Sequence, residues 1–166
     1  MAQIAYLSLG SNIGNRERHL RHAISRLETT GRIASVSSFY ETEPVEFVEQ
    51  AWFLNCVVGV ETTLTPAQLM ASLLGIEQEM GRQRTREKGP RTIDIDVLLF
   101  GDTILHSSGL TIPHPAMHQR RFVLEPLAEI APDARHPVLH KTVSELLEAL
   151  PAGQTVGRIV RANDRS

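Results

Sequence analysis

The sequence lacks the features that would link it to a membrane, to nucleic acid or to an oxidising compartment. Its one cysteine, Cys56, excludes an intramolecular disulfide and disfavours a thiolate zinc site. No apolar run approaches about 18 residues, and the N-terminus has no basic region followed by an apolar segment. With 17 Lys and Arg against 19 Asp and Glu, the net charge of −2 gives no global attraction for nucleic acid or an anionic membrane. We therefore expect a soluble cytoplasmic protein.

The remaining composition is that of one ordinary globular domain. The chain has 166 residues, of which 42% are hydrophobic and 22% are charged. This length fits a single domain with a sizeable core, and the composition argues against disorder. We expect a monomer without internal repeats or low-complexity tracts.

Hydrophobic periodicity predicts two helices and four strands in the first hundred residues. One helix is predicted from Asn15 to about Thr30, with Gly31 as its stop. The other begins at the capping box that starts at Thr65 and ends before Gly81. The strands are predicted at residues 3–9, 32–40, 53–62 and 93–100.

This order, strand–helix–strand–strand–helix–strand, is the ferredoxin-like βαββαβ arrangement. It predicts an α+β fold in which two helices cover one face of a four-stranded antiparallel sheet. Residues 41–51 are expected to form a loop, and residues 154–166 are polar and are expected to fray. We predict C-terminal helical additions, namely a short helix around residues 121–130 and a final helix opened by the capping box at Thr142.

Asp94 and Asp96 are two acidic residues inside an otherwise apolar strand, where aspartate is disfavoured. Side chains at positions i and i+2 share one face, about 7 Å apart, so the two carboxylates lie together on a rigid element. Oxygen ligands of this kind suit magnesium, with substrate phosphates completing its octahedron. The alternative is a solvent-facing acidic pair on an uncovered face of the sheet.

The segment before this strand is strongly basic. Residues 82–91 hold five of the 17 basic residues of an acidic chain. Beside a pair of carboxylates, the natural counter-ion for such a loop is a polyphosphate, because magnesium and arginine together neutralise phosphoryl groups. We expect the loop to be open without an anion and to close over polyphosphate. A merely solvated basic loop is the alternative.

Three further motifs have weaker signals. His114 and His118 are four residues apart, which could mimic a metal-binding helix, but His114 lies between prolines and could instead donate to phosphate. The glycine-rich segment at 10–14 matches neither dinucleotide nor Walker motifs and is interpreted as a turn. Asn55 interrupts an apolar strand, so it could bind a flat heterocycle or be a satisfied core asparagine.

Five segments form a specific combination when they are taken together. They are Gly10-Ser11-Asn12, residues 37–42, residues 53–55, the stretch Gly-Pro-Arg-Thr-Ile-Asp-Ile-Asp at 89–96, and Pro113-His114-Pro115. In these segments the chain closely resembles the 6-hydroxymethyl-7,8-dihydropterin pyrophosphokinase family of folate biosynthesis, from about residue 3 to residue 130. The resemblance implies one pyrophosphokinase domain over residues 1–166. It would transfer diphosphate from ATP to the pterin hydroxymethyl group and release AMP.

The resemblance also implies the roles of individual residues. Asp94 and Asp96 would bind two magnesium ions, and together with Arg82 and Arg91 they would form the catalytic group. The ATP-binding residues would be Glu77, Arg84, Val97, Thr111, His114 and Arg120. The pterin-binding residues would be Thr42, Pro44, Val45, Phe53, Asn55 and Phe122.

Two other functions compete with this interpretation. A two-metal nucleotidyl transferase or cyclase on the same fold would also use paired carboxylates, but it would release pyrophosphate. An RNA-binding module would need aromatic residues on the sheet and a basic surface. Only 5% of the residues are aromatic, and carboxylates repel phosphate without a metal.

Overall fold

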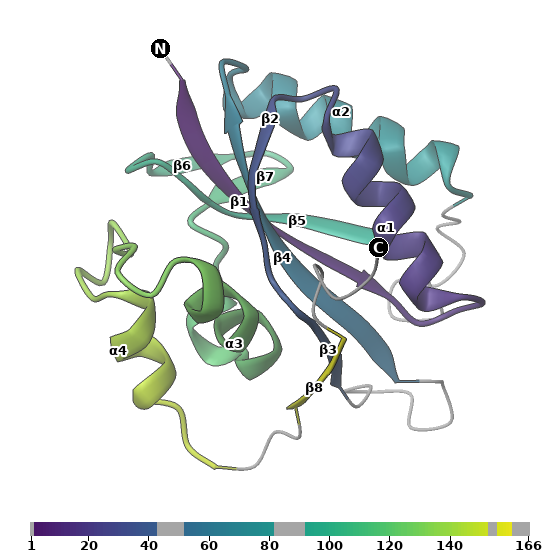
Figure 1. The fold of residues 1–166 in the computed structure, drawn as a ribbon. Coiled ribbons are helices and arrows are strands. Elements are labelled where there is room, and N and C mark those ends of the chain that lie inside the picture. Colours follow the sequence, from purple (N-terminus) through teal and green to yellow (C-terminus); the bar gives the residue numbers. More distant parts are fainter. Residues whose placement is uncertain (1, 43–51, 82–91, 153–155, 161–166) are drawn as a thin grey trace.

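The protein consists of an antiparallel sheet with helices on both faces (Figure 1). The computed structural model describes residues 2–42, 52–81, 92–152 and 156–160. The main sheet has the strand order β5-β1-β4-β3-β8, and β2 pairs with β4 as β3 does. Its strands are β1 (Gln3–Ser11), β2 (Arg32–Val36), β3 (Phe39–Thr42), β4 (Phe53–Thr62), β5 (Asp94–Phe100) and β8 (Val156–Val160).

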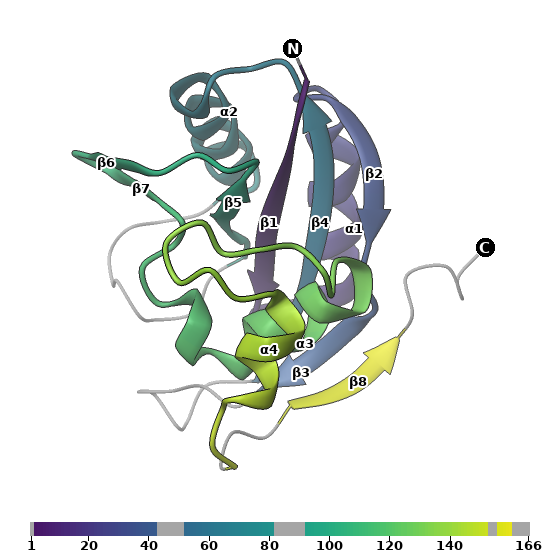
Figure 2. The same cartoon turned by 90° about the vertical axis from the view of Figure 1, so that its left-hand side faces the viewer.

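The predicted ferredoxin-like core is confirmed. Helices α1 (Arg16–Leu27) and α2 (Pro66–Glu79) lie on one face of the sheet, as two perpendicular views show (Figures 1 and 2). Asn15 caps α1 with its side chain, and the predicted capping box at Thr65 opens α2. The first core lies between these helices and the sheet. It includes Leu20, Leu27, Leu69, Leu73, Leu7, Leu9, Cys56 and Val58.

The predicted C-terminal helices cover the other face of the sheet. Helix α3 (Arg121–Ile130) and helix α4 (Val143–Glu148) form a second core with Val57, Leu98 and Leu99. Figure 2 shows these helices on the side of the sheet opposite α1. The sheet is therefore covered on both sides, and α3 packs on the face opposite to α1 and α2.

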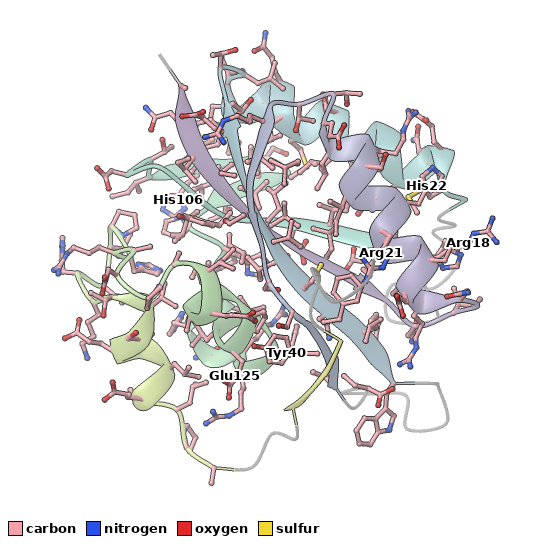
Figure 3. The ribbon with its side chains drawn as sticks, viewed as in Figure 1. Arg18, Arg21, His22, Tyr40, His106 and Glu125 are labelled. Atoms are coloured by element: carbon pink, nitrogen blue, oxygen red, sulfur yellow. The ribbon has the colours of Figure 1, made fainter. Side chains whose placement is uncertain are left out.

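Glu129 at the end of α3 fixes this helix to strand β3. Its carboxylate accepts hydrogen bonds from the Ser38 amide at 3.0 Å and the Ser38 hydroxyl at 2.7 Å, and from the Tyr40 hydroxyl at 2.7 Å. Tyr40 accordingly lies between β3 and α3 (Figure 3). Hydrogen bonds to a carboxylate are stronger than neutral ones, so these three contacts add to the apolar packing of α3 against the sheet.

Strand β5 contains one extra residue relative to β1. Tyr6 pairs with Leu99 but Leu7 pairs with Val97, so Leu98 forms a β-bulge. Val97 accordingly belongs to the first core, whereas Leu98 and Leu99 belong to the second. The apolar end of β5 thus contributes to both cores.

Two element boundaries differ from the sequence prediction. Residues 32–40 form two strands rather than one, because the Ser37 hydroxyl replaces a main-chain partner and accepts the amide of Val57 at 2.9 Å. Helix α1 ends at Leu27, and the Thr30 hydroxyl donates to the carbonyl of Leu27. Gly31 is thus not the stop. A Cβ at Gly31 would lie 2.2 Å from the carbonyl oxygen of Glu61.

Three further segments were not predicted as strands. Strands β6 (Leu105–Ser107) and β7 (Leu110–Ile112) form a separate hairpin, whose turn includes Gly109 at φ +85°. The expected fraying of residues 154–166 is wrong for Val156–Val160, because the edge of β3 provides backbone partners for β8. Residues 153–155 and 161–166 lie outside the described ranges.

His136 organises the connection between α3 and α4. Its Nδ1 accepts the amides of Val138 at 3.2 Å and Leu139 at 3.0 Å, and the residue is buried. Burial lowers the pKa of His136 below its ordinary value of 6.5, and the neighbouring His118 and His140 lower it further. Protonating Nδ1 would remove an acceptor of two hydrogen bonds.

We predict that His136 makes the folded state more sensitive to acid. Because the folded-state pKa of His136 is lowered, its contribution to the unfolding free energy is complete above pH 6.5 and is lost as pH falls through the folded-state pKa. Denaturant unfolding of the wild type and His136→Asn should therefore show a stability difference that shrinks from pH 7.5 to 5. The exposed His22, on the outer side of α1 (Figure 3), gives the control His22→Gln. A difference that stays constant with pH would contradict the assignment.

Candidate functional site

The polar residues singled out in β5, β4 and β3 lie on one face of the sheet. Ile95 and Val97 pack in the first core, so the alternation of a strand places Asp94 and Asp96 on the opposite face. By the same alternation Asn55 lies opposite to Leu54, which is also in the first core. We call the face with Gly10, Thr42, Phe53, Asn55, Asp94 and Asp96 the polar face.

Gly10 occupies the middle of this face. It pairs with Asp94 of β5 on one side and with Asn55 of β4 on the other. Neighbouring strands are about 4.8 Å apart, so the backbones of Asp94 and Asn55 are about 10 Å apart with a residue without a side chain between them. The carboxylates and the amide are thus adjacent groups on one rigid surface.

The Asn55 side chain is buried and held in place. Its Nδ2 donates to the Thr42 hydroxyl at 2.8 Å, across the pairing of β3 with β4. A Cβ at Gly10 would lie 2.8 Å from Asn55 Oδ1 and 3.4 Å from Phe53 Cδ1. The absence of a side chain at Gly10 therefore gives the amide and the Phe53 ring their space. The prediction of a turn at residues 10–14 is wrong for Gly10 and Ser11, because β1 continues through Ser11.

Asp94 and Asp96 are both half-buried, and they fit a magnesium site completed by substrate oxygens. Within the described ranges, no three His, Cys, Asp or Glu side chains come together to hold a metal. Among the described residues, His114 and His118 are therefore not part of such a group. Two carboxylates on one strand instead resemble the sparse protein ligand set that magnesium takes beside phosphates.

Glu77 lies close to the aspartates without sharing their face. It is 3% exposed, and its Oε2 accepts the amide of Ile95 at 2.8 Å. The carboxylate on α2 thereby binds the backbone of β5 between Asp94 and Asp96. The observed contact is with the strand.

His114 reaches the same region from the segment after β7. Its amide donates to the carbonyl of Leu98 at 3.0 Å, and its Nδ1 accepts the amide of Ala116 at 3.1 Å. In the neutral ring this leaves the proton on Nε2, which is then a hydrogen-bond donor. Burial and the charge of Arg120 lower the pKa of His114, and Asp94 acts in the opposite direction.

Arg120 occupies the position immediately before α3 and makes no side-chain capping hydrogen bond there. Its guanidinium lies 5.6 Å from the ring centre of Phe122, a cation–π contact that orders the long side chain. The charges of Arg120 and Asp94 both act on the His114 ring, in opposite directions. A cation, a neutral donor and a carboxylate therefore interact electrostatically in this region.

The other predicted site residues lie on strand β7, in the first core or outside the described residues. Thr111 lies on β7, half-buried and paired with His106. Val97 is 3% exposed in the first core, so its side chain is not on the polar face. The remaining predictions, at Pro44, Val45, Arg82, Arg84 and Arg91, lie outside the described residues.

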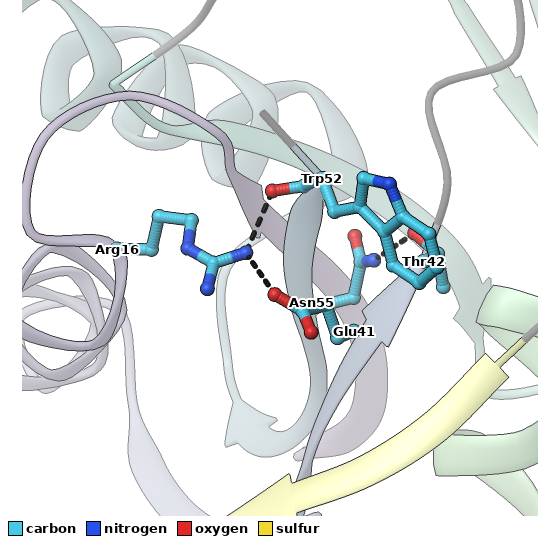
Figure 4. A network of polar contacts seen from close by, with 5 residues as sticks. All are labelled: Arg16, Glu41, Thr42, Trp52 and Asn55. Atoms are coloured by element: carbon cyan, nitrogen blue, oxygen red, sulfur yellow. Dashed lines mark hydrogen bonds and ion pairs between the residues drawn. The ribbon is translucent and has the colours of Figure 1, made fainter. Parts of the chain in front are cut away.

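The sequence interpretation missed Arg16, which contacts the ends of two strands of this site (Figure 4). One signal could have drawn attention to it. A cation in the first turn of a helix is disfavoured by the helix dipole, so its presence there calls for another partner.

Comparison with known proteins identifies relatives along most of the chain. Residues 6–132 match the family described as 7,8-dihydro-6-hydroxymethylpterin-pyrophosphokinase (HPPK). The 2-amino-4-hydroxy-6-hydroxymethyldihydropteridine pyrophosphokinase of Bacillus subtilis is 48% identical over 78% of this chain and 79% of its own length. That of Methylorubrum extorquens is 44% identical over 90% of this chain and 95% of its own.

Longer proteins and solved structures also match. The folic acid synthesis protein fol1 of Schizosaccharomyces pombe is 45% identical over 90% of this chain, which spans only 21% of that protein. A crystal structure of HPPK-DHPS in complex with substrates superposes with a TM-score of 0.70 at 18% identity, over 90% of this chain and 43% of that one, and it supports the fold alone. The family match and the relatives of similar length confirm the resemblance seen in the sequence, and this chain belongs to the 7,8-dihydro-6-hydroxymethylpterin-pyrophosphokinase family.

Proposed function

We propose that the chain transfers diphosphate from ATP to the hydroxymethyl group of 6-hydroxymethyl-7,8-dihydropterin, giving AMP and the pterin diphosphate. One observation supports this assignment most directly. Asp94, Gly10 and Asn55 form one row across three neighbouring strands. A metal–phosphate site at Asp94 and a heterocycle site at Asn55 would meet above Gly10, where no side chain separates the hydroxymethyl group from the phosphorus.

We propose that Phe53, Asn55 and Thr42 bind the pterin, with Phe122 contributing from α3. The Asn55 amide would form hydrogen bonds with the polar edge of the ring, and Phe53 would stack on its face. The buried bond from Asn55 to Thr42 supports this role, because it fixes the orientation of the amide before the ligand arrives. Pro44 and Val45 stay predicted contacts of the same ligand.

On the phosphate side, the described residues offer complementary groups. Neutral His114 would donate Nε2–H to a phosphate oxygen, and Arg120 would supply positive charge from its place against Phe122. Thr111, Arg84 and Val97 stay predicted ATP contacts, and Arg82 and Arg91 stay predicted catalytic cations. Glu77, which we predicted to bind ATP, would act by holding β5 at Ile95.

We propose that Asp94 and Asp96 hold two magnesium ions together with substrate oxygens. When bound, the ions would shield the β-phosphorus from the negative charge of its own oxygens and stabilise the departing AMP. In-line attack by the alcohol then depends mainly on positioning by the chain. A cytoplasmic location and a monomeric state stay predictions.

Product analysis tests the proposed reaction. The chain should form AMP from ATP and magnesium only when the reduced pterin alcohol is present. Free pyrophosphate in place of AMP would indicate the alternative, a two-metal nucleotidyl transferase or cyclase. AMP formation that is independent of the pterin would exclude it as the acceptor.

Gly10→Ala should damage the pterin site specifically. The new Cβ would come 2.8 Å from Asn55 Oδ1, so the amide must move away from its bound orientation. We expect KM for the pterin alcohol to rise about tenfold, the size of one lost hydrogen bond. Gly157→Ala on β8, where no atom of the described residues lies within 4 Å of the added Cβ, is the matched control. An unchanged KM would show that Asn55 tolerates displacement.

A further inference from the structure

Arg16 connects two strands at the ends that carry the proposed pterin residues. Its Nη1 donates to the carbonyl oxygen of Trp52 at 2.7 Å and lies 2.7 Å from Glu41 Oε2 (Figure 4). Glu41 belongs to β3, and Trp52 immediately precedes β4. One guanidinium group thus contacts both chain segments at the end where β3 pairs with β4.

The position of Arg16 in the chain is unfavourable for a helix. It is the first residue of α1, where the helix dipole favours negative charge. The side chain is 28% exposed and that of Glu41 is 29% exposed, so solvent weakens the ion pair and the gain in global stability is small. The contact is therefore better explained by the geometry that it fixes than by stability.

The two sides of the strand pair carry different groups. Glu41 pairs with Leu54, a residue of the first core, so its side chain points toward α1, whereas Thr42 and Asn55 are linked on the polar face. Arg16 consequently acts from behind the sheet. It connects the side chain of Glu41 on β3 with the carbonyl of Trp52, the residue before β4, at the end of the strand pair where Thr42 and Asn55 lie.

We propose that Arg16 is a positioning residue for the pterin substrate, which it affects through the pairing of β3 with β4 and without touching the ligand. This inference rests on the proposed function. Loss of the guanidinium frees the Trp52 carbonyl and Glu41, and the ends of the two strands separate. Phe53 and Asn55 then lose their common orientation, while Asp94 and Asp96, on the other side of β1, keep theirs.

The test compares substrate affinities in Arg16→Met, which keeps the apolar stem of the side chain. We expect KM for the pterin alcohol to rise about tenfold, which is the effect of losing about one hydrogen bond. We expect KM for ATP to change by less than about twofold, because the proposed ATP site lies on other strands. Arg16→Lys, which retains a charged donor, should fall between the wild type and Arg16→Met. Combining Arg16→Met with Glu41→Gln should give less than the sum of the single effects, because both remove one interaction.

Arg18→Met is the matched control, since Arg18 is exposed on the same helix and points away from the sheet (Figure 3). It should leave both KM values unchanged. Equal rises in both KM values for Arg16→Met, or equal effects of Arg16→Met and Arg18→Met, would overturn the role of Arg16. A wild-type chain that forms no AMP with the pterin alcohol would instead overturn the proposed function itself.

Discussion

Asp94→Asn and Asp96→Asn should each lower turnover by orders of magnitude and leave the fold intact. Both replacements keep the shape of the side chain but remove a negative ligand from the proposed magnesium pair. Charge stabilisation in comparable metal clamps contributes several kcal/mol, on the order of a 100-fold or larger change in rate. Initial-rate measurements of AMP formation across a magnesium titration would measure the loss.

The fold should survive because both aspartates are half-buried on the polar face rather than packed in either core. Thermal unfolding midpoints close to that of the wild type would confirm this. Asp102→Asn, at an exposed turn after β5, removes the same charge away from the face and should leave turnover unchanged. Near-normal turnover of both site variants at saturating magnesium would refute the metal-ligand assignment.

Asn55→Ala should weaken pterin binding far more than ATP binding. A site that hydrogen-bonds a polar heterocycle loses about 1 to 3 kcal/mol when one partner is removed. Calorimetric titration of each ligand separates the two affinities. The ATP affinity serves as the internal control, because Asn55 and the aspartates lie on different strands with β1 between them.

Thr42→Val and Thr42→Ser sharpen this experiment. Valine removes the acceptor of the Asn55 amide, whereas serine retains it. Thr42→Val should therefore weaken pterin binding in the same direction as Asn55→Ala, and Thr42→Ser should remain close to the wild type. Equal losses for both ligands with Asn55→Ala would mean that this asparagine is only a satisfied core residue.

The elements that local sequence determines were predicted well. The capping boxes at Thr65 and Thr142 and the alternation through Asp94 and Asp96 define their helices and strand without help from distant residues. The order of these elements then restricts the possible topologies strongly, so the ferredoxin-like core follows.

The parts that depend on distant partners were missed. Strand β8 exists because β3 has an edge to pair with, and the division between β2 and β3 depends on the contact of Ser37 with Val57. The same holds at the site. The partners of Arg16 lie 25 and 36 positions away, as the residue numbers of Glu41 and Trp52 show, and a single sequence does not reveal such a pairing.

The bulge at Leu98 has a consequence for transplanting this site into another protein. Counted back from Phe100, which pairs with Ala5 in the first core, strict alternation would direct both aspartates into the apolar layer beneath α1 and α2. Because of the extra residue, the side chains before the bulge point to the face opposite to the one that strict alternation predicts. One strand therefore combines an apolar C-terminal half with an N-terminal half that carries two carboxylates. A graft of the Asp-Ile-Asp segment onto a regular sheet would have to carry Leu98 with it or be re-registered by one residue.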